Sequence, residues 1–421
     1  PPHFPGMAGI SDRLPTRDTP VPTPSRRIAR LVAGAALGAV IAAMPPVGPA
    51  SQARAESVAG AYLAAEQAAR RGDIAAAADF YTRLLATERD DSGLLERGVL
   101  HILAAGRVDT ALPLARRLDQ LSPGHQMSTL LEAAAAFKAE DYEEVRAVLD
   151  RASPASSPLV TGLIEAWAAF ADGGEDAARA VFDRLSADEE GGAPGRLLTS
   201  YHRGLFEAAL GNTEAALAAF DETAELSGTG TTRLARVRAG VLARSGDIEG
   251  AREVIRDRLS RTLGDERLEA LDEELARGEV PEPVVTIGAA GAAEALYGLS
   301  GFFTRGPKSI FGLAYARLAT YLEPDLIDAK LLIASMLSRQ EQHELAIAAY
   351  ESVPRNAPEA LEALIGRAEA MQEAGQVEPA IVAMREVTAR YPRSIEAFTS
   401  LGDMLRRESR FEEAADRKSV V

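Results

Sequence analysis

The sequence of 421 residues contains no cysteine. This absence excludes disulfides, thiol catalysis, cysteine-ligated zinc sites and a lipid anchor on cysteine. Aromatic residues make up only 5% of the chain, and none of the five histidines has a second histidine at the spacing of a helical zinc motif. No set of residues therefore points to a catalytic site, a metal site or a cofactor, and we expect the protein not to be an enzyme.

Positive charge is also scarce. Asp and Glu number 62 against 46 Lys and Arg, which gives a formal net charge of −16. Because binding to nucleic acid needs a basic surface that meets phosphates, nucleic acid is not expected as a partner. Long apolar runs are missing too, apart from one segment of 14 residues near the N-terminus.

What the chain does contain is a regular period. Pro324, Pro358 and Pro392 lie 34 residues apart, and a small residue stands 12 positions before each of them. A fixed period of this length is typical of a solenoid of stacked helix pairs. The small residues allow two helices to cross closely, and a proline is expected to end the second helix of each pair.

These positions resemble the tetratricopeptide repeat (TPR) family. The matching residues, unit by unit, are Ser300, Gly312, Ala316 and Pro324; Ala334, Ala346, Tyr350 and Pro358; Ala368, Ala380, Met384 and Pro392; and Gly402, Phe411 and Ala414. The resemblance implies two antiparallel helices per unit and a superhelix whose concave wall binds extended or helical segments of other proteins. The resemblance is specific for the fold, but it says little about the partner.

The same frame recurs less cleanly towards the N-terminus, as in Gly72–Ile74, Gly106–Val108 and Gly246–Ile248. We therefore predict an all-α, TPR-type α-α superhelical solenoid of about ten helix-turn-helix units in two arrays. The N-terminal array covers residues 56–260, a helix and linker cover 261–292, and the C-terminal array covers 293–421. Gly278–Pro283 is the expected joint, since residues before proline avoid the helical region.

The first 55 residues read as a targeting segment after a stretch without periodicity. A basic patch at Arg26–Arg30 precedes the apolar run Leu31–Met44, and Ala53–Ala55 offers a small-residue cleavage pattern. This is the order of regions in a secretory signal peptide, from about Met7 to Ala55. We expect the mature chain to begin near Glu56 in the periplasm of a Gram-negative bacterium or outside the cell. An uncleaved segment that anchors the protein in the inner membrane is the alternative.

The predicted groove positions lie on the first helix of each unit. In the C-terminal array they are largely acidic, so a basic or mixed-charge peptide or helix suits them better than an acidic tail. The family's pocket for a C-terminal carboxylate needs Lys and Asn at such positions, and this chain has neither there. The candidate protein-binding residues are Tyr62, Glu66, Glu96, Tyr201, Arg233, Arg236, Glu294, Tyr297, Asp328, Leu331, Glu362, Ile365, Glu369, Glu396, Asp403 and Arg406.

The leading interpretation is a non-enzymatic adaptor that binds a partner in the bacterial cell envelope. One alternative is the partner-binding subunit of an envelope machine that handles polysaccharide or peptidoglycan. The other is the docking arm of a larger enzyme, because Asp416–Val421 match the translation of a common sequencing adapter and suggest a truncated reading frame.

Sequencing the genomic locus through its 3′ end separates these alternatives. A frame that closes after one or two further helices supports the adaptor, whereas one that continues into a domain with catalytic motifs supports the docking arm. A locus that encodes these six residues followed by a stop would refute the truncation.

Overall fold

The computed structural model describes residues 49–153, 156–188, 191–228, 231–262, 265–306 and 309–418. Residues 58–421 form one compact unit. The predicted signal peptide lies outside the described residues except for its end, which belongs to the first described helix. Within the described part, no helix combines the length and the apolar character needed to cross a membrane.

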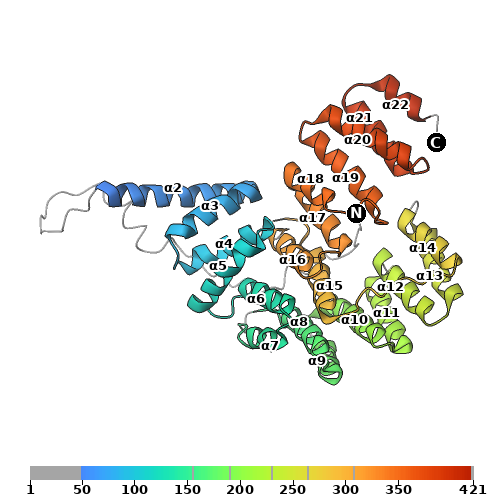
Figure 1. Cartoon of the computed structure of the whole chain (residues 1–421), viewed down its shortest axis with the longest axis horizontal. Coiled ribbons are helices and arrows are strands. Elements are labelled where there is room, and N and C mark those ends of the chain that lie inside the picture. The colour runs from blue at the N-terminus through green and yellow to red at the C-terminus, as the bar shows by residue number, and fades with distance from the viewer. Residues whose placement is uncertain are drawn as a thin grey trace, which may run out of the picture. The chain divides into compact units, whose positions relative to one another are not determined.

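Every regular element in the described residues is a helix (Figure 1). Ten antiparallel pairs and one single helix follow one another, which confirms the predicted fold class and the approximate number of units. The bounds are α2 (Pro49–Arg71) with α3 (Ile74–Thr87), α4 (Ser92–Ala104) with α5 (Val108–Leu121), α6 (Gln126–Lys138) with α7 (Tyr142–Asp150), α8 (Pro158–Ala171) with α9 (Glu175–Ala187), α10 (Gly192–Ala209) with α11 (Thr213–Ser227), α12 (Thr232–Arg244) with α13 (Ile248–Arg261), the single α14 (Glu266–Ala276), α15 (Gly288–Ser300) and the short 3-10 helix η1 (Gly301–Phe303) with α16 (Ser309–Leu322), α17 (Ile327–Arg339) with α18 (His343–Glu351), α19 (Ala360–Glu373) with α20 (Val377–Arg390), and α21 (Ile395–Arg407) with α22 (Phe411–Lys418).

In several pairs, an aspartate at the end of the turn caps the second helix. Asp73, Asp141 and Asp247 stand just before α3, α7 and α13, and each side chain accepts the N–H three residues on, at 2.9, 3.0 and 2.8 Å. Such an N-cap satisfies a donor that the helix leaves unpaired. Gly72 and Gly246 precede two of these caps with φ of 73° and 96°, which ends the first helix and reverses the chain.

Most small residues of the repeat frame are fully buried where helices cross, but the expectation was wrong for Gly402, which is half-buried and has no atom within 4 Å of an added Cβ. Ala346 and Ala380 are 0% exposed, and a Cβ on Gly312 would lie 2.5 Å from the Phe303 carbonyl oxygen. Pro324 and Pro392 follow the ends of α16 and α20 by two residues, as predicted.

The expectation for Pro358 was wrong, because α18 already ends at Glu351. Pro354 lies three residues beyond that end and cannot continue the helix, so Pro358 falls in the turn that leads into α19.

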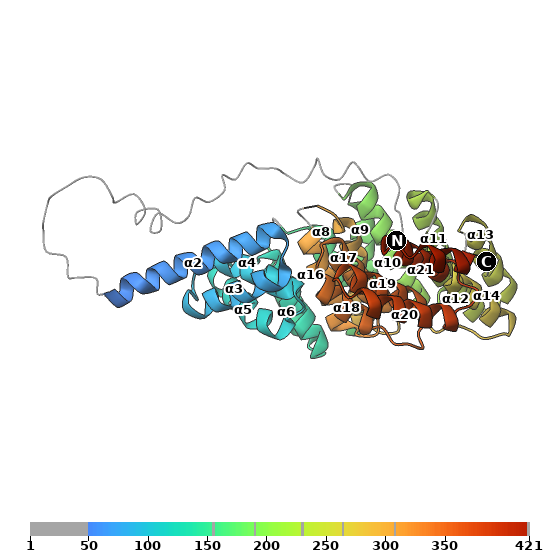
Figure 2. The same ribbon diagram turned by 90° about the horizontal axis from the view of Figure 1, so that it is seen from above.

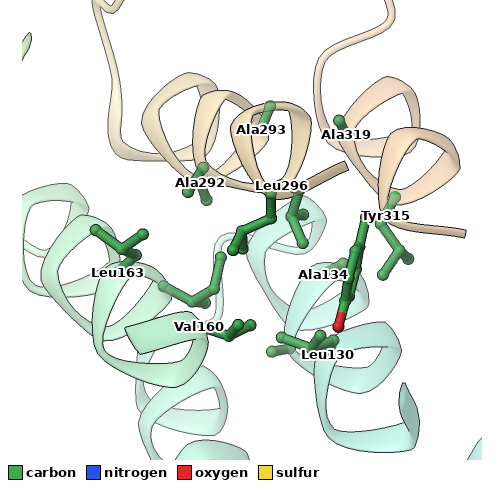
Figure 3. Close-up of a cluster of buried hydrophobic side chains, with 14 of the residues drawn as sticks. Leu130, Ala134, Val160, Leu163, Ala292, Ala293, Leu296, Tyr315 and Ala319 are labelled. Atoms are coloured by element: carbon green, nitrogen blue, oxygen red, sulfur yellow. The ribbon is translucent and has the colours of Figure 1, made fainter. Parts of the chain in front are cut away.

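Helix α15 packs on α8 and α10, and α16 packs on α4 and α6. Figure 3 shows this contact, where Leu296 of α15 faces Leu163 of α8 and Tyr315 of α16 lies beside Leu130 of α6. One cluster of buried apolar residues consequently runs from Ala65 to Ala329. Helices α17, α19 and α21 then follow in sequence, each in contact with the next (Figures 1 and 2). The two predicted arrays therefore share a core, while the predicted domain limits remain a prediction.

The crossing of α15 over α8 depends on glycine. A Cβ on Gly291 would lie 2.1 Å from Cδ2 of Trp167, and one on Gly288 would lie 2.4 Å from the Trp167 carbonyl oxygen. Trp167 is 0% exposed and makes edge-on contacts with Phe170, Phe182 and Phe206. Because this aromatic cluster cannot move aside cheaply, only glycine permits the approach.

We predict that Gly291→Ala destabilises the fold by about 1–3 kcal/mol, as overpacking does in close-packed cores. Gly402→Ala is the matched control, because nothing lies within 4 Å of a Cβ added there. That change should be neutral or stabilise helix α21 by up to about 1 kcal/mol. Urea unfolding followed by the fluorescence of Trp167, the one tryptophan of the chain, measures both variants. Equal stability of the two variants would contradict this account of the crossing.

Candidate protein-binding groove

Four acidic residues occupy the same position in the first helices of successive pairs. They are Glu294 on α15, Asp328 on α17, Glu362 on α19 and Glu396 on α21, each 34 residues after the one before. We call these four residues the acidic ladder. The exposed fraction of the side chain rises along it, from 2% at Glu294 to 17% at Asp328 and 47% at Glu362, and Glu396 is exposed. The ladder thus runs from the interior to the surface.

Arg233 of α12 neutralises the buried end of the ladder. Its Nε donates to Glu294 Oε2 at 3.1 Å and Nη2 donates to Oε1, while Nη1 donates to Asp328. The guanidinium also lies 5.0 Å from the centre of the Tyr297 ring. Burial alone would lower the pKa of Arg233, but the Glu294 and Asp328 carboxylates raise it well above its usual value. The arginine is therefore a permanent cation between two carboxylates.

Two further arginines serve the middle of the ladder. Arg236 of α12 lies 3.7 Å from Asp328 and 3.2 Å from Glu359, and Arg267 of α14 lies 3.7 Å from Asp328 and 3.4 Å from Glu362. Burial works against the charge of Asp328, yet the nearby arginines keep its pKa below the usual range. Arginine side chains thus link α12 and α14 to α15, α17 and α19, and we call the region where these arginines meet the ladder the groove.

Aromatic and imidazole groups enclose the buried end. The Trp167 Nε1–H donates to Nδ1 of His202 at 3.2 Å, and burial, followed by the charge of Arg233, lowers the pKa of His202 to about 3. His202 is consequently neutral at physiological pH. Burial likewise raises the pKa of Tyr201 and Tyr297, so both phenols stay protonated.

The surface end of the ladder has no ion-pair partner in the part of the chain that the structure describes. Among the described residues, Glu396 has neither a hydrogen-bond partner nor an ion-pair partner, and Glu369 accepts a hydrogen bond from the Ser400 hydroxyl at 2.8 Å. Burial first, and then the charge of Glu369, raises the pKa of Glu396. Asp403 and Arg406 pair with each other at 2.5 Å on the surface of α21.

The predicted apolar groove positions lie inside the core. Leu331 is 5% exposed and Ile365 is 4% exposed, so both side chains hold the repeats together and contact no solvent-filled groove. These side chains are buried because the first helix of each pair packs on the first helix of the next pair along this face.

The candidates Tyr62, Glu66 and Glu96 have partners other than the residues of the groove. Glu66 accepts a hydrogen bond from the Tyr81 hydroxyl at 2.8 Å and lies 3.2 Å from Arg97, whose guanidinium sits 5.5 Å from the centre of the Tyr62 ring. Glu96 lies 3.2 Å from Nε2 of His125 one pair further on.

Sequence reasoning missed two members of the groove, Arg267 and Glu359. Arg267 lies on the single helix α14, outside the repeat frame, and Glu359 lies in the turn before α19. The 34-residue spacing of the acidic ladder was the available signal, since stacked carboxylates need cations opposite them.

Comparison with known proteins gives one family match and likenesses to solved structures. The helix pairs and their period define a helical-repeat solenoid. Residues 362–394 match the tetratricopeptide repeat family, which confirms the resemblance seen in the sequence. The chain is similar to the crystal structure of the P58(IPK) TPR domain, with 17% identity over 84% of this chain and 99% of that one and a TM-score of 0.24. It is also similar to yeast Tom70, with 14% identity, coverage of 86% and 96%, and a TM-score of 0.24. No curated protein matches the chain.

We predict that Arg233→Met destabilises the protein by about 3–5 kcal/mol, because it leaves Glu294 as a buried charge without its partner. Adding Glu294→Leu should recover most of the loss, since apolar residues of similar volume often replace a buried ion pair without cost. Urea unfolding of the single and double variants measures both effects.

Arg406→Met serves as the control, because its partner Asp403 is exposed and such pairs contribute about 0–1 kcal/mol. A loss at Arg233 no larger than at Arg406 would show that the buried pair does not hold the groove together.

Proposed function

We propose that this protein is a non-enzymatic interaction scaffold whose groove binds a basic or mixed-charge peptide or helix of a partner protein. The TPR fold itself suggests a protein–protein interaction scaffold. The further detail, which concerns the chemistry of the partner, comes from the charges in the groove.

The observation that carries the proposal is the unpaired end of the acidic ladder. Arginines of α12 and α14 meet Glu294, Asp328 and Glu362, and no described residue does the same for Glu396. Burial and neighbouring carboxylates raise the pKa of Glu396, so its ionised form is held at a cost in free energy. A cationic side chain of a partner would remove that cost by continuing the pattern of pairing.

A small cavity beside the ladder suits an apolar side chain of the same partner. It has a volume of about 140 Å³, comparable to a cavity that holds one aromatic ring. Leu205, Val237 and Leu271 contribute apolar walls, and Arg236 and Arg267 of the groove border it. A segment that alternates basic and apolar residues would therefore fit both features.

We further propose that the partner resides in the cell envelope. The only support for this location comes from the basic and apolar segments of residues 26–55. The same segments support the alternative in which an uncleaved segment anchors the protein in the inner membrane.

We predict that a labelled helical peptide of lysine, leucine and alanine binds the protein, whereas its counterpart with glutamate in place of lysine does not. Combining Glu362→Gln, Glu369→Gln and Glu396→Gln should weaken binding between about threefold and about a hundredfold, since three exposed charge pairs are worth about 0.2–1 kcal/mol each. Affinity should fall as salt rises and as pH falls through the raised pKa values of Glu362 and Glu396, because only the carboxylates attract lysine. Fluorescence anisotropy measures these affinities.

The matched control combines Glu253→Gln, Glu386→Gln and Glu412→Gln, which removes the same charge from exposed residues on second helices of pairs. It should bind like the parent protein. If both triple variants lose the same affinity, the peptide senses only net charge, and the proposed groove is wrong. Equal binding of the lysine and glutamate peptides would also overturn it.

A further inference from the structure

A second cavity lies away from the groove, where the turn between α4 and α5 meets α16. It has a volume of about 510 Å³. Its lining comes from two segments that are about two hundred residues apart in the sequence, namely the turn and first residues of α5, Gly106–Thr110, and the end of α16 with Arg317, Thr320 and Tyr321. The packing of α16 on α4 and α5 brings them together.

Arg317 is a half-buried cation without an anionic partner in the described residues. Its Nε donates to the Ala104 carbonyl at 3.4 Å, and neither terminal nitrogen has a hydrogen-bond partner among the described residues. The guanidinium lies against Gly106, where an added Cβ would come within 3.1 Å of Cζ. Burial lowers the pKa of Arg317 to about 10, so the side chain still carries its charge at neutral pH. A cation that is partly removed from water is stabilised by an anionic partner.

The turn that faces Arg317 lacks the cap found at the same place in neighbouring pairs. Arg107 stands where Asp73 and Asp141 stand one period before and after it, and it makes no side-chain cap. Its guanidinium pairs instead with Asp79 at 2.5 Å. No acceptor among the described residues receives the N–H groups of Val108 and Asp109. The turn thus presents free donors at the positive end of a 14-residue helix.

We propose that this cavity binds an oxyanion, a carboxylate or phosphate group of another molecule, between the guanidinium of Arg317 and the N-terminal N–H groups of α5. The oxyanion would accept hydrogen bonds from the N–H groups of Val108 and Asp109 and at the same time pair with the guanidinium of Arg317. Guanidinium and backbone N–H groups together suit an anion with several oxygens. The site lies outside the acidic groove, so it does not depend on the function proposed above.

Titration calorimetry of the full chain with inorganic phosphate and with acetate, against sodium chloride at equal ionic strength, tests the proposal. We expect saturable binding of at least one oxyanion, and Arg317→Gln should weaken it by about tenfold or more, since hydrogen bonds to charged groups contribute about 1.5–3 kcal/mol. Arg116→Gln removes an equal charge from an exposed position on α5 that does not line the cavity, and it should bind like the parent protein.

The pattern of binding decides the source of the oxyanion. Phosphate alone indicates a phosphate-bearing ligand, and acetate alone or both ions indicate that a carboxylate suffices. Absence of binding by either ion overturns the proposal, as does an equal loss in the two variants. Arg317→Gln should also leave the unfolding midpoint in chloride unchanged or raised, because it removes a partly buried charge that has no anionic partner. A large fall in that midpoint would show that Arg317 is needed for folding rather than kept for a ligand.

Discussion

The close crossing of α15 over α8 is the contact on which the arrangement of the groove depends. Glycine at positions 288 and 291 lets the backbone of α15 reach Trp167, and this contact ties the second half of the solenoid to the middle of the first. From there α16 reaches α4 and α6, and the first helices that follow carry their acidic residues opposite α12 and α14. The positions of both proposed binding sites follow from this one helix–helix contact.

The charges of the groove follow a gradient of burial. At the interior end a carboxylate without a cation would be prohibitive, so Arg233 holds Glu294 and Asp328 in a tight set of hydrogen bonds. Towards the surface, water takes over part of the solvation, and Glu396 can remain unpaired. The same position of the repeat therefore stabilises the fold at the interior end of the ladder. At the surface end it is free to bind a partner.

The period of the sequence was sufficient to predict the all-α solenoid, because small residues such as Ala346 and turn residues such as Gly72 and Asp73 report on local geometry. It could not predict that α15 would return to α8, since this contact joins segments more than a hundred residues apart and leaves no periodic signal. For that reason Glu294, Leu331 and Ile365 were expected to line the groove but lie buried, and Arg267 was overlooked. The ends of helices were also less predictable, as Pro354 and Pro358 show.

Hydrogen exchange followed by mass spectrometry tests the shared core most directly. If the halves of the solenoid depend on the α15–α8 contact, amides of α8, α10, α15 and α16 should exchange most slowly and should become exposed together at the same urea concentration. Early and separate exchange of α15 to α22, while α8 and α10 stay protected, would mean that the two arrays are independent units and would contradict the account.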